Sequence, residues 1–235
     1  MEYDPPLYRP PSEGDNLIVQ ATLGCSFNGC TFCSMYKSKT YRARPMAEVF
    51  ADVEEAARDW PDAHRVFIAD GDALAMPVED MLALLAKLKA ELPELARVSA
   101  YATPINLLRK SPDDLCRIRD AGLGLLYVGI ESGSGDVLRR IRKGATQASM
   151  IKALERAKDA GFKVSATVVL GLGDRPLLTQ LGHSAAGRVK KNVLPFPGSL
   201  STQIRPPCRS TMRFTTASPT PVPSYSLRPC SLWKI

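Results

Sequence analysis

The chain has 235 residues, 45% of them hydrophobic, which is enough for one domain with a proper core or for one domain with an appendage. No run of about 18 apolar residues is present and the start, MEYDPPLYRPPSEGD, is acidic and proline-rich, so we expect neither a membrane span nor a signal peptide and predict a cytoplasmic protein. The net charge of +7 does not indicate a nucleic-acid partner, because residues 175–235 carry nine of the 31 Lys and Arg and none of the 24 acids, which leaves the rest of the chain slightly acidic.

Between residues 17 and 171, segments typical of strands alternate with segments typical of helices. Short runs rich in Val, Ile and Leu predict five buried strands, at 17–22, 65–70, 97–102, 125–130 and 163–171. Amphipathic or leucine-rich runs predict helices at 46–60, 78–91, 134–142 and 147–160. Ser111, followed by Pro112 and two acids, predicts the N-cap of a further helix, and Gly161 predicts the end of the last one.

Five strand–helix units in this order predict an α/β fold, a partial (β/α) barrel of parallel strands covered by helices. Folds of this kind place their chemistry at the carboxyl ends of the strands. Those ends carry a cysteine loop (25–33), DGD (70–72), TP (103–104), ESGSG (131–135) and GLGD (171–174).

The sequence changes character after Asp174, where periodicity disappears and nine of the nineteen prolines fall. We therefore divide the chain into an extended N-terminal arm (1–16), the partial barrel (17–173) and a basic Pro/Ser/Thr-rich tail (174–235) that is largely irregular. We detect no sixth strand–helix unit, so the fifth strand should have an open edge.

The loop CSFNGCTFC places Cys25, Cys30 and Cys33 within nine residues. A closed zinc site needs four ligands and the loop supplies three. A plant-type two-iron cluster needs a fourth cysteine, and Cys116 lies in a predicted helix where a buried, inert thiol is the simpler interpretation. Three thiolates suit a four-iron cluster in which one iron has no protein ligand and can bind a small molecule.

The cysteine loop directly after the first strand, with an aromatic before the last cysteine, resembles that of the radical S-adenosylmethionine (SAM) enzymes. More narrowly, YRPPSEGDNLIVQATLGCSFNGCTFCSMYKSKTYRARP, GIESGSGDVLRRIRKGAT and VVLGLG are similar to a group of uncharacterised Fe-S oxidoreductase-like members. The likeness covers about residues 8–173. The family's commonest spacing has three residues, not four, between the first two cysteines.

The resemblance implies that Cys25, Cys30 and Cys33 hold a [4Fe-4S] cluster whose open iron binds SAM, and that reductive cleavage of SAM starts radical chemistry on an unknown substrate. It implies an electron donor such as a flavodoxin or ferredoxin. It further implies that SAM is contacted by three strand ends, through Asp70, Gly71, Asp72, Glu131, Ser132 and Gly171. A turn at DGD, or a helix cap at Glu131 and Ser132, would explain these residues without SAM.

Two further features have alternatives. Phe32 would either shield the cluster from water or pack as an ordinary loop residue. The run YKSKTYRAR would either hold an anionic substrate or the SAM carboxylate, or form a solvated charged face. The competing function for the whole chain is a non-catalytic iron–sulfur or metal-binding protein, an inactive truncated barrel.

Overall fold

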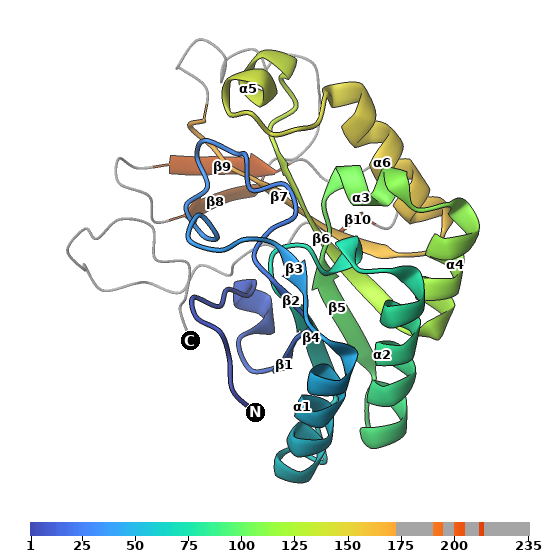
Figure 1. Cartoon of the computed structure of the whole chain (residues 1–235). Coiled ribbons are helices and arrows are strands. Elements are labelled where there is room, and N and C mark those ends of the chain that lie inside the picture. The colour runs from blue at the N-terminus through green and yellow to red at the C-terminus, as the bar shows by residue number, and fades with distance from the viewer. Residues whose placement is uncertain (173–189, 195–199, 205–211, 214–235) are drawn as a thin grey trace, which may run out of the picture.

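The computed structural model describes residues 1–172, 190–194, 200–204 and 212–213. Its centre is a parallel sheet, in the order β1 (Leu17–Gln20), β4 (Arg65–Ala69), β5 (Arg97–Tyr101), β6 (Leu123–Glu131) and β7 (Lys163–Val168). The sheet curves, and its convex face is covered by α1 (Met46–Asp59), α2 (Val78–Glu91), α4 (Pro112–Ala121) and α6 (Gln147–Asp159) (Figure 1). The predicted partial barrel of five parallel strands is confirmed.

Two predicted helix ends are formed by the residues that we expected. The Ser111 side chain accepts a hydrogen bond from the Asp114 backbone N–H and caps α4. Gly161 follows the last helix with a φ of +84°, a conformation that glycine adopts without strain. Local chemistry therefore sets these boundaries.

Several short elements were not predicted. The run 17–22 is divided at Ala21, and β2 (Thr22–Leu23) pairs antiparallel with β3 (Arg42–Ala43). Helix α3 (Pro104–Arg109) directly follows β5, with the Thr103 side chain accepting from the Asn106 N–H. The 3₁₀ turns η1 (Pro11–Glu13) and η2 (Ala73–Ala75) were not predicted either, whereas the short helix α5 (Gly135–Arg140) confirms the helix predicted at 134–142.

Three short strands are described beyond residue 174. Strands β8 (Lys190–Leu194) and β9 (Leu200–Ile204) form an antiparallel pair, and β10 (Met212–Arg213) lies parallel to β7 at Val164 and Ser165. We expected no sixth strand. A two-residue strand has too few residues to show any periodicity, so β10 left no signal in the sequence. The other residues of the predicted irregular tail lie outside the described part of the chain.

The two faces of the sheet bury separate hydrophobic clusters. Side chains such as Val66 and Leu126 pack under the helices on the convex face. On the concave face, Leu7 of the N-terminal arm packs with a second cluster made of Ile18, Phe67, Ala69 and Tyr127. The arm therefore contributes to the core. It covers part of the concave face, as helices cover the convex face.

A buried carboxylate fixes the end of the arm that leads into β1. Glu13 is fully buried and accepts hydrogen bonds from Arg97, at 2.8 and 3.0 Å, and from the Tyr127 hydroxyl, at 2.5 Å. A buried carboxylate is tolerated only when such donors surround it. This ties the arm to the start of β5 and to the middle of β6.

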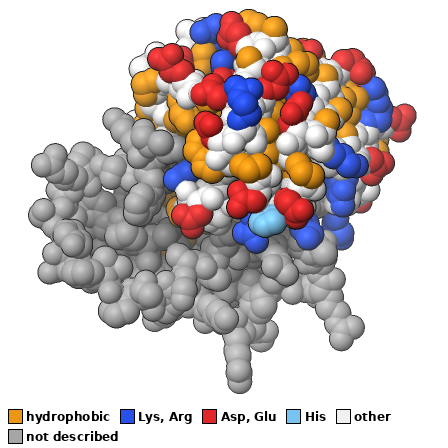
Figure 2. Space-filling model, turned by 90° about the horizontal axis from the view of Figure 1, so that it is seen from below, with side chains coloured by type: hydrophobic (Ala, Val, Ile, Leu, Met, Phe, Trp, Pro, Cys, Tyr) orange, Lys and Arg blue, Asp and Glu red, His pale blue; other side chains and the backbone are white. Residues whose placement is uncertain are grey.

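The surface of the body agrees with its near-balanced charge. On the face seen in Figure 2, acidic and basic side chains are interspersed with hydrophobic ones. Among the described helices, we find none with the length and apolar character needed to cross a membrane.

We predict that Leu7→Ala lowers the free energy of unfolding by about 2–5 kcal/mol, because Leu7 is 1% exposed in the concave cluster. The matched control is Ile151→Ala, at a side chain that is 51% exposed, and it should change stability by less than about 0.5 kcal/mol. Urea denaturation followed by circular dichroism measures both. Equal effects of the two substitutions would show that the arm is not part of the core.

Candidate functional site

The three cysteines lie in the loop that follows β2, at the end of the sheet where α5 also lies (Figure 1). Cys25, Cys30 and Cys33 are free, partly buried thiols. Burial raises the pKa of Cys30, the Lys143 ammonium opposes that shift, and the charges of Cys33 and Cys25 add to it.

Within the described residues, no three His, Cys, Asp or Glu side chains come close enough together to hold a single metal ion. The cysteine sulfurs of a four-iron cluster stand further apart than the ligands of one ion, because each sulfur binds a different iron atom.

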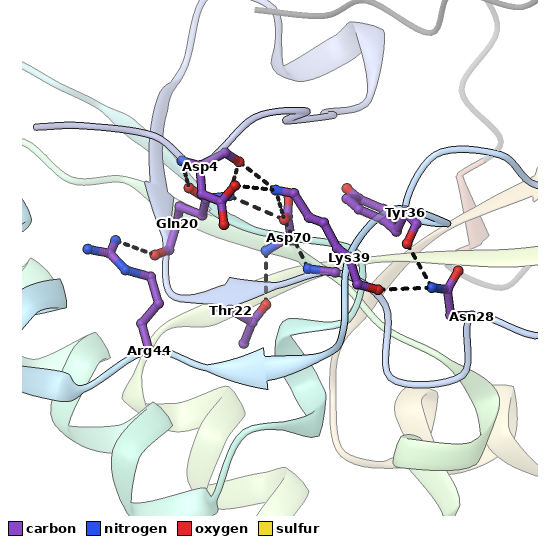
Figure 3. Close-up of polar contacts among 9 residues, drawn as sticks. Asp4, Gln20, Thr22, Asn28, Tyr36, Lys39, Arg44 and Asp70 are labelled. Atoms are coloured by element: carbon purple, nitrogen blue, oxygen red, sulfur yellow. Dashed lines mark hydrogen bonds and ion pairs between the residues drawn. The ribbon is translucent and has the colours of Figure 1, made fainter.

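The loop is held closed by Asn28. Its side-chain Nδ2 donates to the backbone carbonyls of Tyr36, at 2.7 Å, and Lys39, at 3.2 Å (Figure 3). Its own carbonyl accepts from the Lys37 ammonium at 2.6 Å. Asn28 has a φ of +43°, in the left-handed region that Asn enters more readily than most residues.

The far side of the loop rests on the segment between α5 and α6. The Phe27 ring packs so closely on Gly144 that a Cβ there would lie 2.4 Å from ring carbons. The Thr31 N–H donates to the Ile141 carbonyl at 2.9 Å. The segment GIESGSGDVLRRIRKGAT therefore supports the cysteine loop directly.

Asp70, directly after β4, is fully buried and joins several segments. Its Oδ2 accepts from the Gly24 N–H at 3.1 Å, from the Lys39 ammonium at 3.0 Å and from Gln20 Nε2 at 3.2 Å (Figure 3). Lys39 also donates to the Asp4 carbonyl in the N-terminal arm. Burial raises the pKa of Asp70, and the hydrogen bonds from Gly24 and Lys39 oppose that shift.

The solvated charged face that we expected for the basic run YKSKTYRAR holds for the exposed Lys37 and Arg42 but not for Lys39 and Arg44. The Lys39 side chain is 6% exposed and paired with Asp70, and Arg44 donates to the Gln20 carbonyl at 2.8 Å and to Asp52 at 2.6 Å. Both cations hold the fold together at the root of the loop, and only exposed members of the run such as Lys37 are solvated.

Asp72 is also fully buried, but its donors are uncharged. Its Oδ2 accepts from the Ser26 hydroxyl in the cysteine loop, from the Thr103 hydroxyl at 2.9 Å and from Asn106 Nδ2 at 2.6 Å. Its Oδ1 accepts from the Thr103 N–H at 3.2 Å. Burial raises the pKa of Asp72. Thr103 and Asn106 belong to α3 and its cap, so the unpredicted helix completes this cluster.

The end of β6 contributes a buried ion pair. It lies at the carboxyl ends of the strands, around the cysteine loop, a region that we call the mouth. Glu131, 6% exposed and with a φ of +63°, accepts from the Lys143 ammonium through Oε1 at 2.8 Å. Ser132 is buried and its hydroxyl accepts from the Ser134 N–H, while Ser134 itself caps α5. The helix cap is thus Ser134 rather than Glu131 or Ser132. Gly171 is exposed, with a φ of +84°.

Four buried side-chain atoms around this mouth make no hydrogen bond of good geometry within the described structure: Tyr36 Oη, Tyr41 Oη, Asp70 Oδ1 and Glu131 Oε2. Asp70 nevertheless acts on Tyr36, because burial raises the pKa of Tyr36 and the charge of Asp70 and a hydrogen bond to it raise that pKa further. Burial raises the pKa of Tyr41, and the charges of Asp72 and Cys25 raise it further. Buried polar atoms without a partner are uncommon in folded proteins. Tyr36 and Tyr41 were missed from the sequence, where nothing but their position just after the third cysteine could have indicated them.

Two sequence-predicted residues remain. Cys116 is exposed on α4, so the prediction of a buried thiol there was wrong. Phe32 is 36% exposed. Its ring lies at the protein surface, so the described chain does not bury it as a core residue.

A family model described as the radical SAM superfamily matches residues 19–176. A protein of Methanocaldococcus jannaschii, provisionally named a methylthiotransferase, is 27% identical over 67% of this chain and 35% of its own length. The heme chaperone HemW of Bacillus subtilis is 25% identical over 66% of this chain and 42% of its own. The chain thus spans less than half the length of these two relatives.

Solved structures share the fold. The cobalamin-dependent SAM radical enzyme OxsB, with SAM bound, superposes with a TM-score of 0.53 at 17% identity, over 66% of this chain and 24% of its own. Methylornithine synthase (PylB) gives a TM-score of 0.52 at 20% identity, over 72% and 49%.

We predict that Gly71→Ala lowers the free energy of unfolding by about 1–3 kcal/mol through overpacking. A Cβ at Gly71 would lie 2.6 Å from the Tyr36 ring and 3.1 Å from Cys25 Cβ. The matched control is Gly124→Ala in β6, where the nearest atom to the new Cβ is 3.9 Å away, and it should have a smaller effect. Chemical denaturation compares the two, and a larger loss in Gly124→Ala would contradict the packing argument.

Proposed function

This chain belongs to the radical SAM superfamily, and from that premise we propose that Cys25, Cys30 and Cys33 hold a [4Fe-4S] cluster with one iron open to SAM. When bound, such a cluster supplies the electron that cleaves SAM reductively and starts radical chemistry. The chain itself has to bind SAM, orient it and exclude water around the reacting atoms.

The observation that carries the proposal is the set of four unpartnered buried polar atoms beside the partly buried thiols. Two are carboxylate oxygens, which accept hydrogen bonds, and two are phenol hydroxyls, which donate or accept them. SAM presents an ammonium group, a carboxylate and ribose hydroxyls, so its polar groups suit these atoms. Bound SAM would supply partners that the chain alone does not give them.

Each predicted SAM residue has a role that its contacts allow. Glu131 Oε2 is free to accept from a ribose hydroxyl while Oε1 keeps Lys143. Ser132 lies next to it, and Gly171 offers backbone that SAM can approach closely. Asp70, Gly71 and Asp72 form the strand end that faces the ammonium group of SAM, with Asp70 Oδ1 as an available acceptor.

The substrate, as we propose it, is a small molecule that reaches the open end of the sheet, and an external donor such as a flavodoxin or ferredoxin supplies the electron. We further propose a cytoplasmic location, because a cluster held by Cys25, Cys30 and Cys33 needs thiols that a reducing compartment keeps free of disulfides.

Anaerobic reconstitution with iron and sulfide should give about four irons per chain, as expected for one four-iron cluster. With a reductant, the protein should convert SAM to methionine and 5′-deoxyadenosine. Replacing Cys25, Cys30 or Cys33 by Ser should abolish both, whereas Cys116→Ser, at an exposed thiol outside the loop, should abolish neither. Iron binding without SAM cleavage would favour the non-catalytic alternative.

We predict that Glu131→Gln weakens SAM binding about tenfold, because it replaces the free charged acceptor by an amide while Lys143 keeps an oxygen partner. Isothermal titration of SAM into the unreduced, reconstituted protein measures this. Glu155→Gln, at an exposed acid on α6, is the control and should bind SAM as the natural chain does. Unchanged affinity in Glu131→Gln would remove Glu131 from the site.

A further inference from the structure

Two short segments pair closely at the first cysteine. Residues 24–26 contain Cys25 in the middle, and residues 70–72 contain Gly71 in the middle. The Gly71 N–H donates to the Gly24 carbonyl at 3.0 Å, and Gly71 brings its backbone against Cys25 Cβ. The acids on either side of Gly71 then reach the residues on either side of Cys25.

On one side, Asp70 Oδ2 accepts from the Gly24 N–H at 3.1 Å. The Asp70 carboxylate is fixed in turn, because Lys39 and Gln20 donate to the same oxygen and the Asp70 N–H donates to the Thr22 hydroxyl at 2.9 Å (Figure 3). Thr22, Gln20 and Lys39 all belong to segments that lead into or out of the cysteine loop.

On the other side, Asp72 Oδ2 accepts from the Ser26 hydroxyl. Thr103 and Asn106 orient this carboxylate from the end of β5 and from α3. Asn106 Nδ2 also lies 3.0 Å from the Ser26 hydroxyl, so the serine is held by two partners.

We propose that Asp70 and Asp72 are positioning residues that hold Cys25 from both sides and fix the first cluster ligand before the cluster is bound. This inference rests on the proposed function of Cys25. A ligand that is held in place beforehand loses less freedom when it binds, and supporting hydrogen bonds of this kind commonly decide the affinity of metal centres. The two acids act through the loop and not by touching the cluster.

The two carboxylates should respond differently to replacement by amides. Asp72 uses both oxygens as acceptors, so Asn at 72 must turn an NH₂ group toward Ser26 or toward the Thr103 N–H. The donors Gln20, Gly24 and Lys39 all bond Oδ2 of Asp70, so Asn at 70 keeps an acceptor for the Gly24 N–H when its NH₂ group takes the place of Oδ1. Asp72→Asn is therefore the cleaner test, because Asp70→Asn also removes the charge that pairs with the buried Lys39 ammonium.

Hydrogen–deuterium exchange of the cluster-free chain measures directly how firmly Asp70 and Asp72 hold residues 24–26. We call this arrangement the clamp. We expect Asp72→Asn to raise exchange in peptides covering residues 22–30 by about tenfold, and Asp70→Asn to raise exchange in the same peptides. Ser26→Ala, which removes only the loop's donor, should act like Asp72→Asn and decides the matter if the latter does not fold. Glu13→Gln is the control: a buried acid at the other end of the sheet, whose loss should leave residues 22–30 unchanged.

Reconstitution then tests the consequence for the cluster. Asp72→Asn and Ser26→Ala should bind less iron than Glu13→Gln and should alter the electron paramagnetic resonance spectrum of the reduced cluster. Unchanged exchange at residues 22–30 in both variants overturns the inference. A natural chain that takes up no iron would overturn the proposed function instead, while the exchange data would still support or refute the clamp.

Discussion

Two buried carboxylates at the end of β4 set the constraint on which the site depends. A carboxylate removed from water must find donors inside the protein, since leaving it unpaired costs more than most single contacts contribute. Asp70 and Asp72 find theirs on the cysteine loop, in Gly24, Lys39 and Ser26. The conformation of the loop therefore determines whether the two acids have these hydrogen-bond donors, and the two acids in turn hold the loop in that conformation. A loop that moved away would leave both carboxylates buried without those donors.

The N-terminal arm extends this dependence to the concave face. Lys39 joins Asp70 to the arm at Asp4, and the ring of Tyr8 meets that of Tyr36 edge-on at 5.3 Å. On that face, Leu7 packs in the second hydrophobic cluster, and Glu13 pairs with Arg97 at the start of β5. The arm thus occupies the part of the concave side that lies toward the amino ends of the strands. The unpartnered polar atoms lie instead around the carboxyl ends of the strands, where we propose that SAM binds.

The sequence predicted those features that depend on local pattern. Periodicity located α2 at 78–91 with its bounds correct, and capping chemistry located Ser111 and Gly161. Contacts between distant segments left no such signal. Lys39 was interpreted as part of a charged run, because its partner Asp70 is 31 residues away. Helix α3 was missed because Thr103 and Pro104 were interpreted only as the end of a strand, and its role in holding Asp72 depends on contacts between distant segments.

The charges at the mouth also bear on what it binds. Lys39 pairs with Asp70 and Lys143 with Glu131, whereas the hydrogen-bond donors to Asp72 are neutral groups from Ser26, Thr103 and Asn106. A buried carboxylate whose donors are uncharged stabilises a positive charge that comes near it. SAM brings two, on its sulfonium and its ammonium group. Asp72, one of the two acids that we propose to hold Cys25, therefore also makes the electrostatic potential of the mouth favourable to a cation, without having to touch it.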